Sequence, residues 1–180
     1  MNGTNRSTIA AELAGVPADF RDLIEQASTA DLHRRSDGTR WSNKQLLFHM
    51  VFGYLIVRTL MPLVHLLGRS GWSRRFAATL DAAHRPFHLI NYLGSVGGGQ
   101  LLPTRTMAAL LDRSCRALTD RLTSETEPSL ALTMHFPTRW DPYFRDTMRV
   151  LDVYHYGTEH YRHHRRQLSL RSTTDSSPQP

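Results

Sequence analysis

Two histidines near the end of the chain, His160 and His164, have the spacing of paired metal ligands. Residues four apart in a helix lie on one face, about 6 Å apart along the axis, so both imidazoles can reach one ion. Imidazole is a common ligand of zinc, nickel, iron and copper. Two histidines do not complete a metal site. The chemistry therefore depends on a third ligand and on the helices that carry the set.

These histidines fall in the segment that we predict to be the last helix. Asp141 is a good N-cap, Pro142 suits the first helical position, and the apolar spacing continues to about Leu170. The face of His160 and His164 also carries Val153, Gly157 and Gln167, with Val150, Tyr156 and Leu168 at its edges. Both histidines therefore point toward the core of the protein.

Two further histidines of this helix point elsewhere. His155 lies on the opposite face, with Arg162, and we expect it to face solvent. His163 lies about 100° around the helix from His164, which makes it a weaker candidate ligand.

A second predicted helix supplies a third inward histidine. Ser42 and Gln45 have the spacing of a capping box, and the helix continues to about Leu67. His49 lies on its apolar face with Leu46, Phe52, Gly53, Ile56, Leu60, Val64 and Leu67, whereas Arg58 and His65 lie opposite. Three inward histidines leave one coordination position open, which is the pattern of catalytic rather than structural metal sites.

Four neighbours of the histidines complete the candidate site, namely Gly53, Gly157, Tyr156 and Gln167. Gly53 and Gly157 each lie about one turn from a histidine, although glycine costs a helix interior about 1 kcal/mol relative to alanine. They indicate either room for a substrate beside the ion or close packing of the helices. Gln167, one turn beyond His164, is placed to hydrogen-bond a ligand imidazole. No residue is assigned a catalytic role.

The remaining segments predict an all-α protein. Apolar spacings of three and four indicate helices over residues 8–30, 73–83 and 104–124, and no strand alternation stands out. We predict a four-helix bundle with a short extra helix and long irregular connections. The chain suits a single domain, residues 8–170, with disordered tails at 1–7 and 171–180.

The segment 84–103 is expected to be irregular. His84 and His88 are four apart, but Pro86 between them disfavours a helix and hence a ligand pair. The glycine cluster 94–99 lacks the lysine and hydroxyl ending of a phosphate loop. It is interpreted as a flexible connector, with a flap over the substrate as the alternative.

A second irregular segment, Met134–Trp140, precedes the last helix. Its aromatic residues either plug the end of the bundle or bind a ligand. Cys115 falls on the apolar face of the 104–124 helix and is interpreted as a small buried hydrophobe.

Composition limits the partners. The net charge is +6, but the arginines are scattered and Lys44 is the only lysine, so we expect no nucleic-acid binding. A single cysteine forms no intramolecular disulfide and suits a reducing cytoplasm. Residues 1–10 lack the apolar core of a secretory signal, and the apolar segment 47–67 contains Arg58 near its middle. We therefore expect a cytoplasmic protein without a membrane span.

Two motifs resemble the signature regions of the DinB-like superfamily. One is Trp41-Ser42 followed by Leu46-Leu47-Phe48-His49-Met50, and the other is His160-x-x-x-His164-Arg165-x-Gln167-Leu168. The resemblance implies an up-down-down-up bundle, frequently a homodimer, with a divalent metal held by His49, His160 and His164. Many members carry a glycine where this chain has Arg166. Because Arg166 projects away from the ligand face, we expect it to change the surface rather than the site.

The resemblance also implies an activity. Members of known function are often metal-dependent transferases that use low-molecular-weight thiols. The leading hypothesis is therefore a thiol-dependent S-transferase that acts on an electrophilic small molecule, with zinc as the first choice of ion and nickel, iron or manganese as alternatives. A metal-dependent hydrolase and a non-catalytic bundle that binds a small molecule are the other two hypotheses.

Overall fold

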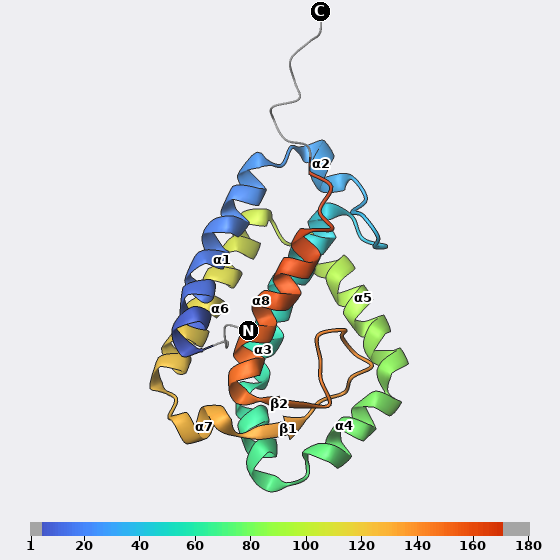
Figure 1. The fold of residues 1–180 in the computed structure, drawn as a ribbon. Coiled ribbons are helices and arrows are strands. Elements are labelled where there is room, and N and C mark those ends of the chain that lie inside the picture. The colour runs from blue at the N-terminus through green and yellow to red at the C-terminus, as the bar shows by residue number, and fades with distance from the viewer. Residues whose placement is uncertain (1–4, 171–180) are drawn as a thin grey trace, which may run out of the picture.

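The structure, a computed structural model, describes residues 5–170 and consists mainly of helices (Figure 1). The helices are α1 (Arg6–Gln26), α2 (Thr29–His33), α3 (Asn43–Ser70), α4 (Ser73–Ala82), α5 (His84–Leu101), α6 (Thr104–Ser124), α7 (Glu127–Ala131) and α8 (Val150–Arg165). Two short strands, β1 (Thr133–His135) and β2 (Thr147–Arg149), pair antiparallel with Met134 opposite Met148. The predicted all-α class is confirmed.

Four helices, α1, α3, α6 and α8, form the bundle. Both α1 and α3 lie against α6 and α8, so each of the four contacts two others. In Figure 1, α1 and α8 run upward while α3 and α6 run downward, which gives the up-down-down-up order in the chain. α5 packs on the outside of α3 and continues from the short helix α4.

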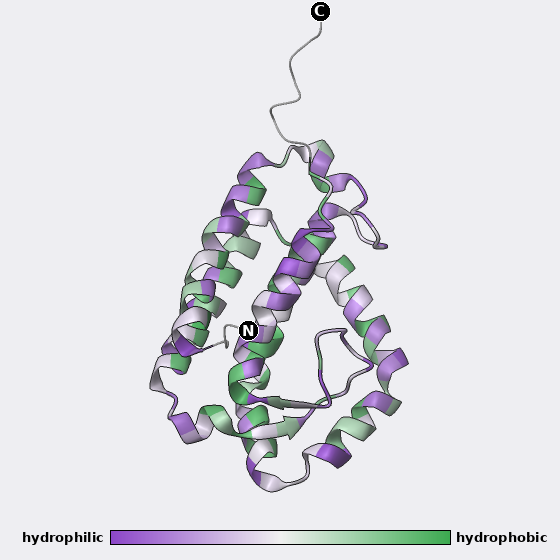
Figure 2. Ribbon diagram, viewed as in Figure 1, coloured by the Kyte–Doolittle hydropathy of each residue, from purple (hydrophilic) through white to green (hydrophobic). Residues whose placement is uncertain are grey.

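The first helix begins earlier than predicted. The side-chain oxygen of Asn5 accepts a hydrogen bond from the Thr8 N–H at 2.9 Å and caps α1, so residues 6 and 7 are helical rather than disordered. The predicted tail residues 1–4 and 171–180 lie outside the described residues. Apolar and polar residues alternate along α1 (Figure 2), and its inward residues Ile9, Leu13 and Phe20 are almost fully buried. Each contributes roughly 1.5–3 kcal/mol through burial.

α3 is the central helix and begins with the predicted capping box. The Ser42 hydroxyl accepts from the Gln45 N–H at 3.3 Å, and the Gln45 side chain accepts from the Ser42 N–H at 3.0 Å. By length and composition α3 is apolar enough to cross a membrane, but half of its most apolar window is buried inside the bundle. Packing against α5, α6 and α8 accounts for the buried half of this window.

His65 lies on the side of α3 opposite His49, as predicted, and is buried there. His65 is 7% exposed, its Nδ1 lies 2.8 Å from the Met61 carbonyl oxygen, and its Nε2 lies 2.8 Å from Oε1 of Glu125. The helical projection gave its direction correctly. It did not show that the side of α3 opposite His49 is covered by other elements of the bundle.

The segment 84–103 is helical, which corrects the prediction of an irregular connection. Pro86 is accommodated because it lies in the first turn of α5, where a backbone N–H has no helical partner. The glycine cluster lies within this helix. A Cβ at Gly99 would be 2.6 Å from the Cα of Gln45, and one at Gly98 would overlap the ring of Phe48. Gly98 and Gly99 therefore allow α5 to pack closely on α3, and the cluster is part of a helix rather than a connector or a flap.

The last helix begins later and ends earlier than predicted. Asp141 marks a turn, in which its side chain accepts from the Tyr143 N–H at 2.9 Å, and β2 follows before α8 starts at Val150. The cap that we assigned to Asp141 comes instead from Asp152, which accepts from the Arg149 N–H at 2.9 Å. The helices over 73–82 and 104–124 agree closely with the prediction.

Candidate metal centre

α3 and α8 bring His49, His160 and His164 together. One side-chain nitrogen from each lies within 4.8 Å of the other two. His49 and His160 are buried, and His164 is partly exposed. Within residues 5–170, no other group of three or more histidine, cysteine or acidic residues has this arrangement. The structure thus assembles the three predicted ligands.

Two glycines allow these helices to approach. A Cβ at Gly53 would lie 2.7 Å from Nδ1 of His160, and a Cβ at Gly157 would lie 3.0 Å from the ring of Tyr54. Gly157 therefore serves close helix packing. Gly53 makes room for the ring of His160 and also faces the adjacent cavity.

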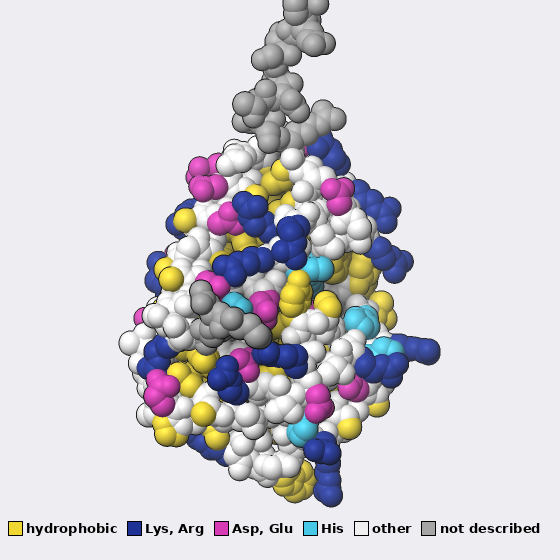
Figure 3. All heavy atoms as spheres, in the orientation of Figure 1, with side chains coloured by type: hydrophobic (Ala, Val, Ile, Leu, Met, Phe, Trp, Pro, Cys, Tyr) yellow, Lys and Arg dark blue, Asp and Glu magenta, His cyan; other side chains and the backbone are white. Residues whose placement is uncertain are grey.

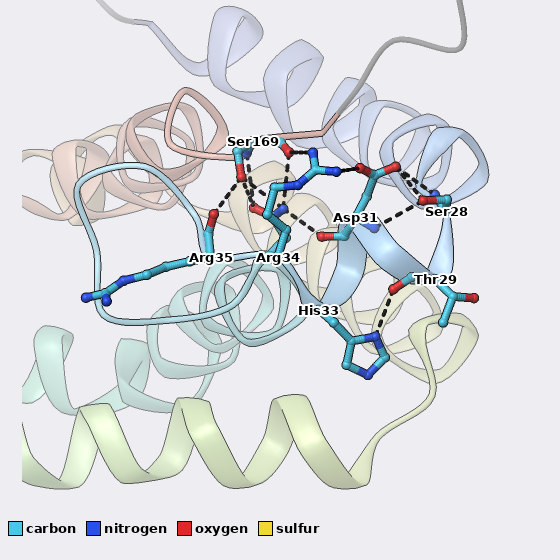
Figure 4. Close-up of polar contacts among 8 residues, drawn as sticks. Ser28, Thr29, Asp31, His33, Arg34, Arg35 and Ser169 are labelled. Carbon is cyan, nitrogen blue, oxygen red and sulfur yellow. Dashed lines mark hydrogen bonds and ion pairs between the residues drawn. The ribbon is translucent and has the colours of Figure 1, made fainter. Parts of the chain in front are cut away.

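The segment that follows α8 is tied to the segment that precedes α3 and to the first residue of α3. Figure 4 shows Ser169 beside Arg34 and Arg35. The Ser169 hydroxyl donates to the Arg35 carbonyl at 2.7 Å, and the Ser169 N–H donates to the side-chain oxygen of Asn43 at 3.0 Å. The Arg34 guanidinium donates to the Ser169 carbonyl at 3.0 Å. Ser169 follows the last residue of α8 by four positions, so these bonds keep the C-terminal end of α8, and His164 within it, near the N-terminal end of α3.

The hydrogen bonds of His49 fix its tautomer. Nδ1 of His49 lies 3.0 Å from the Ser95 hydroxyl, and that hydroxyl donates its proton to the Asn91 carbonyl at 2.8 Å. The Ser95 oxygen must therefore accept from the Nδ1–H of His49. Neutral His49 then carries its lone pair on Nε2, which is the form that binds a metal.

His164 is oriented in the same way by Gln167. Nδ1 of His164 lies 2.7 Å from Oε1 of Gln167, an oxygen that only accepts, so the lone pair of neutral His164 also lies on Nε2. The Nε2 atoms of His49 and His164 face each other at 3.2 Å with no proton between them. Two nitrogens that bind one ion at 2.0–2.1 Å in tetrahedral geometry lie roughly 3.3 Å apart. A shared cation therefore fits this pair.

His160 completes the set from inside the bundle. None of the hydrogen bonds within residues 5–170 involves its ring: Nδ1 is buried without a partner, and Nε2 is 3.9 Å from the Asp141 carboxylate. Buried polar groups nearly always have a partner. An imidazole left free beside two lone pairs suits the third ligand of an ion.

All three imidazoles are neutral at pH 7. Burial, followed by the nearby His164 and His163, lowers the pKa of His49 to about 3. Burial also lowers the pKa of His164 to about 4 and holds the pKa of His160 well below its usual value. Neutral rings keep their lone pairs available, so the donor set fits a divalent ion.

The other histidines lie outside this set. His155 is half-buried rather than in open solvent, and its Nδ1 lies 2.8 Å from Glu12 on α1. Nδ1 of His163 is 3.2 Å from the Tyr143 hydroxyl. His84 and His88 share α5 with their rings 6.2 Å apart, but they belong to no cluster of three or more such residues in the described chain.

A cavity of about 240 Å³ opens beside His49 and His160. It lies between α3, α4, α5 and the loop of residues 136–146, and we call it the chamber. Phe136 and Trp140 of the predicted irregular segment line it, so these aromatics form its wall as well as packing against the bundle. Tyr156, expected at the edge of the ligand face, also lines the chamber.

Several site residues escaped the sequence prediction. Asp141 lines the chamber and accepts a hydrogen bond from the Tyr156 hydroxyl at 3.0 Å, and burial raises the pKa of its carboxyl group. Ser95 orients His49 from α5, a helix we had not predicted. Trp41 stacks on the ring of His49 with centroids 4.4 Å apart. Only Trp41, through its place in a signature motif, was signalled in the sequence.

A family model of the DinB superfamily matches residues 12–168, and the chain belongs to this superfamily. The match includes all three histidines and the bundle from residue 12 of α1 onward. Comparison with curated proteins and with solved structures gives no significant match. The resemblance found in the two motifs is therefore confirmed, and the family adds support to a three-histidine metal site without specifying a reaction.

Proposed function

We propose that this protein is a metal-dependent S-transferase that joins a low-molecular-weight thiol to an electrophilic small molecule. His49, His160 and His164 would hold the divalent ion, zinc by first choice. The observation that carries the proposal is the pair of unprotonated Nε2 atoms 3.2 Å apart, with the unpartnered His160 beside them. Three protein ligands leave a position for an exogenous group.

A bound divalent ion would supply a positive charge that lowers the pKa of a thiol. The thiol would release its proton to solvent water at the partly exposed His164 side. Its sulfur would then form a bond to the electrophilic carbon, and the leaving group would depart with the bonding electron pair. The chain's own part is to orient the ligands through Ser95 and Gln167 and to shield them from water by burial.

We also propose that the protein is cytoplasmic, forms a homodimer and binds neither nucleic acid nor membranes. Lys and Arg side chains are spread among acidic ones on the face shown in Figure 3 rather than gathered in one patch.

The first experiment measures consumption of an electrophile by the zinc-, nickel- or manganese-loaded protein with and without added thiol. We expect consumption only with thiol. Consumption without thiol would support a hydrolase, and no consumption under either condition would support a binding bundle. The control is His155→Ala, which should retain activity, whereas His164→Ala should lose it.

A further inference from the structure

The chamber differs in composition from one end to the other. Its polar groups, His49, Asn91, Asp141, Tyr156 and His160, gather at the histidine end. Asp141 lies 3.9 Å from His160, the His160 ring is centred 4.9 Å from that of His49, and the Asn91 carbonyl bonds Ser95 next to His49. The rest of the wall is aliphatic or aromatic, for example Ile56 and Leu60 of α3, Phe76 and Leu80 of α4, and Phe87 of α5.

Most of these polar groups are already engaged. The Tyr156 hydroxyl donates to Asp141, and Nδ1–H of His49 donates to Ser95, whose hydroxyl is held by the backbone carbonyl of Asn91. A ligand in the chamber would therefore find few partners away from the histidines. A charged or strongly polar body would lose its hydration without compensation.

The outer wall is held in place by the loop of residues 136–146. The Trp140 indole N–H donates to the Leu80 carbonyl at 2.8 Å, and its ring stacks on Phe87 at 3.6 Å between centroids. The Arg139 N–H donates to Asp81 at 3.1 Å. The chamber is therefore formed before a ligand enters, so little binding energy goes into ordering the loop.

We propose that the chamber binds the apolar, uncharged body of the electrophilic substrate, with the reacting carbon at the histidine end. This inference rests on the proposed function. It assigns the two substrates to different sides of the ligands, because low-molecular-weight thiols that carry carboxylates do not suit an apolar wall. The thiol then approaches from the partly exposed His164 side.

Two dyes with the same ring system test the chamber without requiring turnover. N-phenyl-1-naphthylamine is neutral, and 8-anilinonaphthalene-1-sulfonate carries an added sulfonate. We expect the neutral dye to bind the zinc-loaded protein with a Kd at least tenfold lower. Similar Kd values for the two dyes, or no binding of the neutral dye, would overturn the proposal.

Matched variants locate the dye. Leu60 lines the chamber and is 41% exposed, so Leu60→Asp should fold, as checked by its circular dichroism and melting temperature, and should raise the Kd of the neutral dye at least tenfold. Ile56→Asp is the second variant on the same wall. Leu66→Asp, on α3 but outside the chamber, should leave the Kd unchanged. Loss of binding in Leu93→Asp, on the exposed face of α5, would place the dye outside and contradict the proposal.

The outcome can be separated from that of the proposed function. Zinc uptake and thiol-dependent consumption are measured on the same preparation. Selective binding of the neutral dye by a protein that takes up no ion would leave the chamber standing and remove the transferase. Thiol-dependent turnover without selective dye binding would support the transferase and overturn the proposal for the chamber.

Discussion

The two sides of the histidine cluster offer opposite surroundings to an incoming molecule. The chamber lies on the side of His160. Beyond the histidine end, its wall consists of aliphatic and aromatic side chains. On the side of His164 lies a polar rim, which we define as Tyr143, His163 and Arg166. Tyr143 bonds His163 at 3.2 Å and Arg166 at 3.5 Å, and the ring of His163 is centred 4.8 Å from that of His164. One set of ligands can thus serve two partners of different polarity.

The largest effect is expected where the two sides meet. His49→Ala or His164→Ala removes one of the two lone pairs that face each other at 3.2 Å, and we expect bound zinc to fall from about one ion per chain to none. Elemental analysis of the purified protein measures this. His155→Ala is the control because its ring contacts Glu12 instead. Equal loss in all three variants, or an ion-free wild type that refuses zinc, nickel and manganese, would remove the shared centre.

Each side of the cluster contributes one residue that orients a ligand imidazole, Ser95 for His49 and Gln167 for His164. Ser95→Ala and Gln167→Ala leave the ligands in place but remove a hydrogen-bond partner from His49 and His164 respectively. Loss of such a partner typically lowers metal affinity 10- to 100-fold, and we expect this for both variants. Competition with a chromophoric chelator measures it. The control is Ser114→Ala, whose buried hydroxyl bonds only the Leu110 carbonyl. Unchanged affinity in both variants would contradict the tautomers assigned to the ligands.

The chamber side should respond to the length of the electrophile. A series of neutral alkyl electrophiles with the same reacting group should show KM falling roughly fourfold for each added methylene, the equivalent of about 0.8 kcal/mol of buried CH₂, until the chamber is filled. Steady-state kinetics at saturating thiol gives the values. The same extension on the thiol is the control and should have little effect. A series in which both substrates respond equally would break the distinction between the sides.

The helical spacing of apolar residues made much of the site predictable from the sequence. The spacing of apolar residues in α3 and α8 is regular, so it oriented His49, His160 and His164 correctly, although their helix ends were uncertain. The cap at Ser42 was equally visible because a capping box is a local signal.

Three features of the structure were not visible in the sequence, for identifiable reasons. Asp141 was read from the local Asp-Pro pattern as a helix cap, but pairing of β1 with β2 places it in a turn beside the chamber. Ser95 was hidden in a glycine-rich segment, where glycine serves contact with α3 rather than irregular backbone. His65 shows that a helical projection gives direction and not the number of neighbours. The surroundings of all three residues depend on contacts between elements that are distant in the sequence.

The rim side should respond to the charge of the thiol. Arg166 is exposed beside Tyr143, so Arg166→Ala should raise KM for a carboxylate-bearing thiol by roughly two- to fivefold, the size of an exposed ion pair. An uncharged thiol such as 2-mercaptoethanol is the matched substrate and should be unaffected. The Kd of the neutral dye should also stay constant. An equal rise in KM for both thiols would show that Arg166 acts on the structure rather than on thiol charge.

The smallest expected effect is on stability and concerns the contact of Asp19 on α1 with α8. The Asp19 carboxylate accepts from the Arg165 guanidinium at 2.8 Å and from the Tyr161 hydroxyl at 2.7 Å, and these partners, Arg165 first, hold its pKa below the ordinary value of 3.8. Because the folded-state pKa is the lower one, the stabilisation is fully present above about pH 4 and is lost as pH falls through the folded-state pKa. The melting temperature of Asp19→Asn should therefore lie below that of the wild type at pH 7 and converge with it in acid. Asp22→Asn, at an exposed site one turn along α1, is the control. A difference that persists unchanged to pH 2 would show that Asp19 stabilises α8 through packing rather than through its charge.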